Sequence, residues 1–282
     1  MLKLYSEGLI IMDNKSLKKH ATNMRKNIVE MVYTAQSGHP GGSLGSADIL
    51  AMLYLEEMNI NKKNVASTNR DRFVLSKGHC SPGLYAALYE KGLIDEDLHS
   101  FRQLHSKLQG HPNMNYIDAV DMSTGSLGQG ISTAVGMAIA NKLDNNKNRV
   151  YVLCGDGESE EGLVWEAMMA AAHYNLDNFC VIFDQNGLQI DGNVEDVIGP
   201  LPLDKKAKAF GFNVVKADGN DFDSLRAAFK NARETKGKPT CIVAKTVKGK
   251  GVSFMENNYA WHGAAPNKEQ YEQAMKDLKE AK

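Results

Sequence analysis

The sequence predicts an α/β fold: a doubly wound, mostly parallel sheet with helices on both faces. Two observations lead to this class. Short apolar runs rich in β-branched residues alternate along the chain with longer segments of helical periodicity. The short runs are continuously apolar rather than strictly alternating, as expected for strands that are covered on both faces. Strand–helix–strand repetition at this spacing is typical of a parallel sheet.

The expected elements follow from these two patterns in chain order. The apolar runs predict strands at RFVLS (72–76), RVYVLC (149–154), FCVIFD (179–184), NVVKA (213–217) and TCIVAKT (240–246). The helical periodicity predicts helices at 15–35, 46–57, 82–91, 129–143, 161–174, 221–233 and 267–280. Nearly all of their apolar stripes are interpreted as core. We therefore expect one domain over 15–282, preceded by an N-terminal extension over 1–14.

Composition and charge limit the class of protein. The 282 residues are 43% hydrophobic and 24% charged, which is ordinary for a globular protein with a sizeable core. With 33 basic and 34 acidic residues the net charge is −1, which argues against binding to nucleic acid or an anionic membrane. No apolar run approaches the roughly 18–20 residues of a membrane span, and the run at 9–12 is too short for a signal peptide. We expect a cytoplasmic protein.

The four cysteines have no metal-type spacing. Cys154, Cys180 and Cys241 lie in expected strands, so buried free thiols are predicted, and neither a disulfide nor a zinc site is indicated.

Loops rich in glycine or histidine stand out between the expected elements. In parallel sheets, ligands gather at the C-terminal edge of the strands, and several of these loops follow a strand directly. The loops are SGHPGGSLG (37–45), SKGHCSPG (76–83), STGSLGQG (123–130), CGDGESEEG (154–162), DQNGLQIDG (184–192), VKGKG (247–251) and WHGAAP (261–266).

Two of these loops together predict a metal site. Asp156 follows one expected strand between two glycines, and Asn186 follows the next strand. The helical stretch between them supplies the crossover that parallel neighbours need, so the two side chains are expected side by side. Carboxylate, amide and backbone carbonyl oxygens suit Mg²⁺ or Ca²⁺. Either loop alone is more simply a common turn, whereas the pair at neighbouring strand ends favours a metal.

Three further carboxylates follow Asp156. Glu158 and Glu160 are interpreted as solvated loop charges. Glu161 opens the next helix, where a carboxylate complements the positive end of the helix dipole.

The Gly155-Asp156-Gly157 sequence, followed after 27 residues by Gln185-Asn186, resembles the thiamine-diphosphate-binding motif. Gln185 departs from the Asn that is usual at the first position of the pair. The resemblance implies thiamine diphosphate as cofactor. It also implies Asp156, Asn186 and the carbonyl of Leu188 as ligands of Mg²⁺, for which Ca²⁺ is a possible substitute.

The remaining loops narrow this resemblance to the transketolase family, because they occur in the family's order from about residue 15 to 270. The implied fold is the diphosphate-binding domain of the thiamine-diphosphate fold. The resemblance implies catalytic roles for His39, His79, His111, His262 and Glu161. It implies contact with the cofactor for His79, Gly125, Ser126, Leu127, Gly157, Asn186, Lys248 and His262.

The histidines suit ketol transfer. The reaction breaks a C–C bond next to a carbonyl, with the thiazolium as electron sink, and it moves protons at sugar hydroxyls near neutral pH, where imidazole is an effective acid and base. Four of the eight histidines lie in loops that contain glycine or proline. A role in a turn explains any one of them equally well, but four on one rim favour function.

A dinucleotide-binding dehydrogenase is the weaker rival class. The glycines of STGSLGQG are spaced G-x-x-G-x-G instead of G-x-G-x-x-G, and no clear strand ends directly before them.

Full-length transketolases continue with two more domains, so the resemblance implies the amino-terminal subunit of a split transketolase. The missing part supplies the glutamate that protonates the aminopyrimidine and most of the grip on the sugar phosphate. Glu161 is expected to face that glutamate. We expect no turnover by this chain alone, and a heterotetramer with two copies of each subunit. The helices 129–143 and 161–174, rich in small residues and methionine, are candidates for the subunit interface.

Pentose-phosphate sugars are the default substrates. Three alternatives stay open: a fragment of a longer enzyme, a non-catalytic paralogue that only binds a partner, and a split enzyme for another sugar phosphate.

Overall fold

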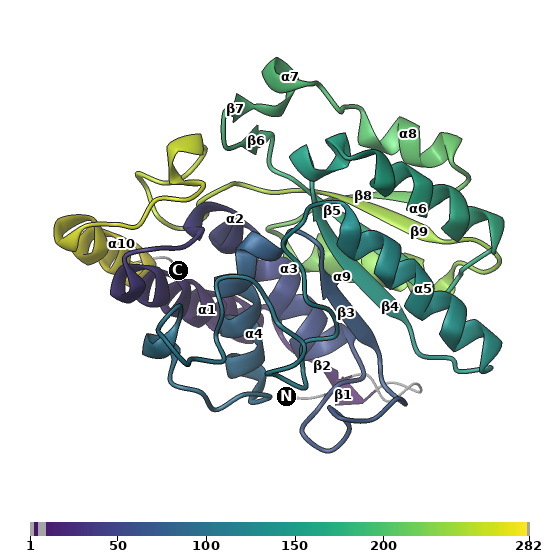
Figure 1. The fold of residues 1–282 in the computed structure, drawn as a ribbon, viewed down its shortest axis with the longest axis horizontal. Helices are drawn as coiled ribbons and strands as arrows, with labels where there is room; N and C mark the ends of the chain where they lie inside the picture. The colour runs from purple at the N-terminus through teal and green to yellow at the C-terminus, as the bar shows by residue number, and fades with distance from the viewer. Residues whose placement is uncertain (1–2, 5–9, 281–282) are drawn as a thin grey trace.

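A single parallel sheet organises the computed structural model, which describes residues 3–4 and 10–280 (Figure 1). Its five strands run in the order β3-β4-β5-β9-β8. They are β3 (Arg72–Leu75), β4 (Val150–Gly155), β5 (Phe179–Gln185), β8 (Asn213–Asp218) and β9 (Thr240–Lys245). All five were expected, each within one residue of its bounds. Much of the expected N-terminal extension lies outside the described residues.

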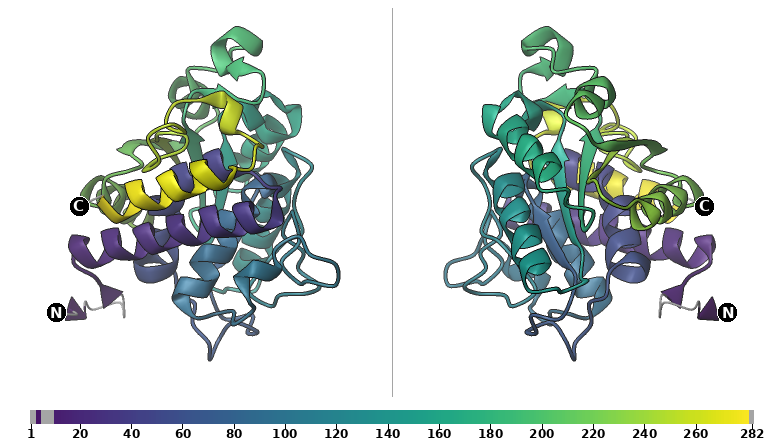
Figure 2. Two further views of the ribbon diagram at one scale, coloured as in Figure 1. Left: turned by 90° about the vertical axis from the view of Figure 1, so that its left-hand side faces the viewer. Right: turned by 90° about the vertical axis from the view of Figure 1, so that its right-hand side faces the viewer.

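Helices cover both faces of this sheet, so the predicted fold class is confirmed. The core on one face includes side chains of α1 (Asn14–Ala35), α3 (Ala47–Met52), α4 (Ser81–Lys91), α9 (Phe222–Glu234) and α10 (Lys268–Glu280), the last packed on α1. The other face packs against α5 (Gln129–Leu143), α6 (Gly162–His173) and α8 (Leu203–Ala209). Figure 2 shows α10 alongside α1, where the rings of Tyr33 and Tyr271 stack with centroids 4.1 Å apart.

The continuous apolar pattern of the strands has a direct cause. In β4, Tyr151 and Leu153 point into the core beneath α1, α3 and α4, while Val152 and Cys154 point into the core beneath α5 and α6. Both sets are fully buried, because successive strand side chains alternate between two covered faces. Cys154, Cys180 and Cys241 are buried free thiols, as predicted, and Cys80 is a fourth.

Several short elements depart from the expected pattern. The expected helix 46–57 is α3 followed by a π-helical turn over Leu53–Glu57. The helices α2 (Pro40–Gly45), α7 (Val194–Val197) and α8 were not expected, nor were the two-residue hairpin strands β1 (Lys3–Leu4) with β2 (Ile10–Ile11) and β6 (Leu188–Gln189) with β7 (Gly192–Asn193). Three of the six residues of α2 are glycine, the poorest helix former after proline, but the whole helix is buried. Tertiary contacts therefore stabilise it.

The parallel register determines which loops meet. Gly155 at the end of β4 pairs with Asp184 in β5, and Gln185 pairs with Lys245 at the end of β9. The loops that follow these strands therefore leave the same edge of the sheet side by side. None of the helices among the described residues is long and apolar enough to cross a membrane.

Candidate functional site

Asp156 and Asn186 emerge from neighbouring strand ends, as predicted. Asp156 is 2% exposed. Its Oδ1 accepts the Gly157 N–H at 2.9 Å, and its Oδ2 accepts the Gly187 N–H at 2.5 Å. These bonds fix the carboxylate between the two loops. Burial and the nearby Asp184 carboxylate raise the pKa of Asp156 to about 6.

The donor atoms at this point fit a hard cation. They are the Asp156 carboxylate, the Asn186 amide oxygen and the Leu188 carbonyl, and the last already accepts the ammonium of Lys248 at 2.9 Å. No group of three or more His, Cys, Asp or Glu side chains suited to a metal occurs within the described residues. A metal here would therefore rely on an all-oxygen set that includes amide and carbonyl groups, which suits Mg²⁺ or Ca²⁺.

The glycines of the surrounding loops allow backbones to pack closely. A Cβ on Gly41 would lie 2.8 Å from the Trp261 carbonyl oxygen, and one on Gly78 would lie 2.6 Å from Thr124. A side chain at either position would displace the neighbouring loop, because real Cβ contacts are longer than this. The Gly157 N–H, expected to meet a diphosphate, donates to Asp156 in this structure.

The four loop histidines come together. The ring centroids of His39 and His79 are 5.2 Å apart, and those of His79 and His262 are 5.0 Å apart and stacked. His39 lies 5.5 Å from His262 and 6.4 Å from His111. Four separate loops thus contribute to one imidazole cluster.

The cluster is neutral at pH 7. Burial, followed by the Arg102 and His111 charges, lowers the pKa of His39 to about 4, and burial with Lys248 lowers that of His262 to about 3. A neutral imidazole has one nitrogen that donates and one that accepts. Among the described residues the buried Nδ1 of His39 has no hydrogen-bond partner, which leaves it for a ligand. The effect of the Arg102 charge on the pKa values of His39 and His111 was not predicted from the sequence.

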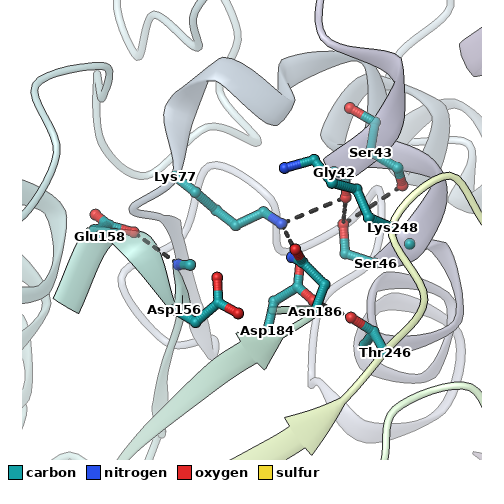
Figure 3. A network of polar contacts seen from close by, with 12 residues as sticks. Gly42, Ser43, Ser46, Lys77, Asp156, Glu158, Asp184, Asn186, Thr246 and Lys248 are labelled. Carbon is teal, nitrogen blue, oxygen red and sulfur yellow. Dashed lines mark hydrogen bonds and ion pairs between the residues drawn. The ribbon is translucent and has the colours of Figure 1, made fainter. Parts of the chain in front are cut away.

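A buried ion pair, which was not predicted either, lies beneath the cluster. The Lys77 ammonium donates to Asp184 and, at 3.4 Å, to the carbonyl of Gly42 (Figure 3). The second oxygen of Asp184 accepts the Thr246 hydroxyl. The side chains of Lys77 and Asp184 are 2% and 0% exposed. The pair connects the loop after β3 to β5 and the end of β9. The sequence signal that could have indicated this pair is Asp184, a charged residue at the end of an apolar strand.

The interpretation of Glu158 and Glu160 as solvated loop charges is wrong. A 3₁₀ turn over Gly157–Glu160 directs both inward. Glu158 is 3% exposed and accepts three hydrogen bonds. Glu160 is half-buried, and among the described residues its Oε1 is buried without a partner.

The remaining predicted residues lie at the edge of the site. Glu161 is the exposed N-cap residue of α6, and a Cβ on Gly128 would lie 2.8 Å from its Cβ. Gly125 packs against the His111 ring, since a Cβ there would lie 3.0 Å from Cδ2. Ser126 and Leu127 continue this loop, the first exposed and the second half-buried.

Relatives match the chain along most of its length. A family model described as "Transketolase, thiamine diphosphate binding domain" matches residues 16–279. An apulose-4-phosphate transketolase subunit of Phocaeicola vulgatus is 39% identical over 270 residues, which is 95% of this chain and 96% of that protein. The 6-deoxy-6-sulfo-D-fructose transketolase subunit SqwG of a Clostridium species is 41% identical over 263 residues, which is 93% of this chain and 96% of that protein.

Solved transketolases share the fold. The transketolase from Campylobacter jejuni superposes with a TM-score of 0.88 at 38% identity, covering 95% of this chain and 43% of that chain. The present chain thus spans about two-fifths of that transketolase and nearly all of the two subunits. On these matches, the chain belongs to the transketolase family, in which it corresponds to the thiamine-diphosphate-binding domain.

Proposed function

We propose that the chain is the amino-terminal subunit of a cytoplasmic transketolase that depends on thiamine diphosphate and Mg²⁺. Paired with a separate carboxy-terminal subunit, it transfers a two-carbon ketol unit between sugar phosphates. The observation that carries this proposal is the convergence of the Asp156–Asn186 pair and four neutral histidines at one sheet edge. Relatives that are named as transketolase subunits, and that match over nearly their whole length, support the split arrangement.

The metal and diphosphate would be held at the strand ends. Asp156, Asn186 and the Leu188 carbonyl would bind Mg²⁺, while Lys248 and the Gly157 amide would face the diphosphate. When bound, thiamine diphosphate supplies the electron sink for breaking a C–C bond next to a carbonyl. In this structure the Leu188 carbonyl accepts a hydrogen bond from the Lys248 ammonium, which the metal would have to displace.

The histidines would hold and move protons on the sugar. His39 and His79 would line the space around the thiazolium and the substrate, and His111 and His262 would complete the cluster. Because their pKa values are lowered, each ring starts neutral, so that one nitrogen can accept a proton from a hydroxyl and the other can donate a hydrogen bond. The unpartnered Nδ1 of His39 is available for such a bond.

The partner would cover the outer side of α5 and α6. A Cβ on Gly136 or Gly162 would meet nothing within 4 Å, so both helices present open backbone there. Leu143 and Met169 on the same helices are 77% and 53% exposed. Glu161 and the 125–127 loop border this surface. A heterotetramer with two copies of each chain would bury it twice.

The relatives differ in the sugar for which they are named. One relative is named for apulose 4-phosphate and another for 6-deoxy-6-sulfo-D-fructose, so the family's subunits of this length are not restricted to pentose phosphates. A substrate panel should therefore include phosphorylated and sulfonated ketoses.

The decisive experiment combines the chain with its carboxy-terminal partner and measures ketol transfer with thiamine diphosphate and Mg²⁺. We expect turnover by the pair, none by this chain alone, and loss of turnover with EDTA or Asp156→Ala. Turnover by the single chain would refute the split arrangement. Complex formation without turnover on any sugar would favour a partner-binding paralogue.

A thermal-shift titration tests the cofactor separately. Thiamine diphosphate alone, Mg²⁺ alone, both together and NAD form its four arms. A ligand at 100 times its Kd stabilises the folded state by about 2.7 kcal/mol. We expect the full shift only with thiamine diphosphate and Mg²⁺ together. A shift in melting temperature with NAD instead would favour a dinucleotide-binding dehydrogenase.

A further inference from the structure

Glu158 joins three loops of the site through one buried carboxylate. Its Oε1 accepts the Ser76 hydroxyl at 2.5 Å and the Gly128 N–H at 2.9 Å. Its Oε2 accepts the Gly155 N–H at 2.9 Å. The residue is 3% exposed, so water cannot replace these donors. We propose that Glu158 is a positioning residue, which sets the relative placement of the loops that bind the cofactor; this inference rests on the proposed function.

Each of the three partners stands next to a residue of the site. Ser76 precedes Lys77 of the buried ion pair, and Gly155 precedes Asp156. Gly128 follows Leu127 and packs against Glu161. Displacing Glu158 would therefore move the metal-binding loop, the 123–128 loop and the loop after β3 relative to one another.

The hydrogen bond from the Gly128 N–H to Glu158 also caps the start of α5. Gly128 is the N-cap residue of that helix, with a φ of 79°, and it has no side chain to cap with. Glu158 supplies the missing acceptor from a distant part of the chain, and its negative charge complements the positive end of the helix dipole. One backbone N–H at the start of α5 is thus satisfied by a buried carboxylate.

All three partners are neutral donors, and a charged acceptor forms stronger bonds with them than a neutral one. Glu158→Gln keeps the volume but replaces one acceptor oxygen by an NH₂ group. Whichever way the amide is turned, that NH₂ faces an N–H donor: Gly155 in one orientation, Gly128 in the other. The substitution therefore removes at least one of the loop connections without opening a cavity.

The test measures amide hydrogen exchange in the ligand-free chain. We expect exchange in segments 123–130 and 154–162 to accelerate about tenfold or more in Glu158→Gln, beyond any change in the core strands. Glu160→Gln is the matched control in the same turn, because its Oε1 bonds to no described residue, and it should leave both segments unchanged. Ser76→Ala, which removes one donor only, serves if Glu158→Gln does not fold, and should accelerate exchange in segment 76–83.

Cofactor titration at saturating Mg²⁺ gives the second measurement. We expect the Kd for thiamine diphosphate to rise about tenfold in Glu158→Gln and to stay unchanged in Glu160→Gln. Unchanged exchange in both segments, or an unchanged Kd, would overturn the positioning role. If the unsubstituted chain and its complex bind no thiamine diphosphate, the proposed function fails instead, and the exchange measurement still decides whether Glu158 holds the loops together.

Discussion

Replacing Asp184 by Asn isolates the contribution of the buried ion pair. The side chains of Asp184 and Lys77 are 0% and 2% exposed, and the carboxylate binds the ammonium on one oxygen and the Thr246 hydroxyl on the other. An Asn has the same shape but no charge. The substitution leaves the Lys77 ammonium buried without its countercharge, with the new amide oxygen and the Gly42 carbonyl at 3.4 Å as neutral hydrogen-bond acceptors.

The size of the effect follows from that uncompensated charge. Removing one partner of a buried ion pair costs about 3–5 kcal/mol. With an unfolding entropy of about 2.1 cal/mol/K per residue, a chain of 282 residues loses about 0.6 kcal/mol of stability per degree near its Tm. Asp184→Asn should therefore lower the Tm by about 5–8 °C.

Urea and thermal unfolding of the single chain, followed by circular dichroism, measure the loss. The double variant Lys77→Met/Asp184→Asn removes both charges and should recover most of the stability, because a buried ion pair contributes little net energy over an uncharged pair of similar volume. Lys230→Met, in an exposed pair with Glu234, is the control and should change stability by less than about 0.5 kcal/mol. A loss below about 1 kcal/mol in Asp184→Asn, or a double variant as unstable as the single one, would refute this reasoning.

Three further predictions concern other residues of the site and its loops. Glu161→Gln should weaken association with the partner while leaving Mg²⁺ affinity unchanged; a lower metal affinity would instead make Glu161 a ligand. Because the pKa values of His39 and His262 are lowered to about 4 and 3 from the usual 6.5, the folded chain binds fewer protons than the unfolded chain. The contribution of these two neutral rings to the free energy of unfolding is fully present above pH 6.5 and is lost toward pH 3–4. His262→Asn should therefore reduce the fall in the free energy of unfolding, measured with urea, between pH 7 and 5. An unchanged slope of that free energy against pH would contradict this. Gly41→Ala should cost about 1–3 kcal/mol in urea unfolding, since its Cβ would lie 2.8 Å from the Trp261 carbonyl oxygen, and unchanged stability would mean that the loop yields freely.

The fold could be predicted because its signals are local and repeated. Each buried strand is a continuous apolar run, and a helical pattern separates most of them, so the strands fell within one residue of their true bounds. What escaped prediction is short or glycine-rich. The helix α2 contains three glycines in six residues and is stabilised by its tertiary contacts with α1, α4 and the loops around it.

The site residues, too, could be predicted where the signal is local and could not where it depends on distant contacts. Asp156 and Asn186 could be placed together because consecutive parallel strands end at one edge, and the histidines because their loops follow the family's order. The roles of Lys77, Asp184 and Glu158 could not be predicted in this way. Whether a carboxylate in GDGES is solvated or buried depends on donors far along the chain, here Ser76 and Gly128, which no local pattern reveals.

The buried charges around the site suggest why metal and diphosphate would bind together. Lys77 is compensated by Asp184, and Glu158 by three donors. Burial still raises the pKa of Glu158, and Asp156 and Lys248, which carry charges of opposite sign, also lie in an environment that disfavours their charged forms. Burial and Asp184 raise the pKa of Asp156, whereas burial and Lys77 lower the pKa of Lys248. A divalent cation would stabilise the carboxylate and a diphosphate would stabilise the ammonium. The cation without the diphosphate would leave the Lys248 ammonium uncompensated, and the diphosphate without the cation would leave the Asp156 carboxylate uncompensated. Binding of the cation therefore favours binding of the diphosphate, and the reverse.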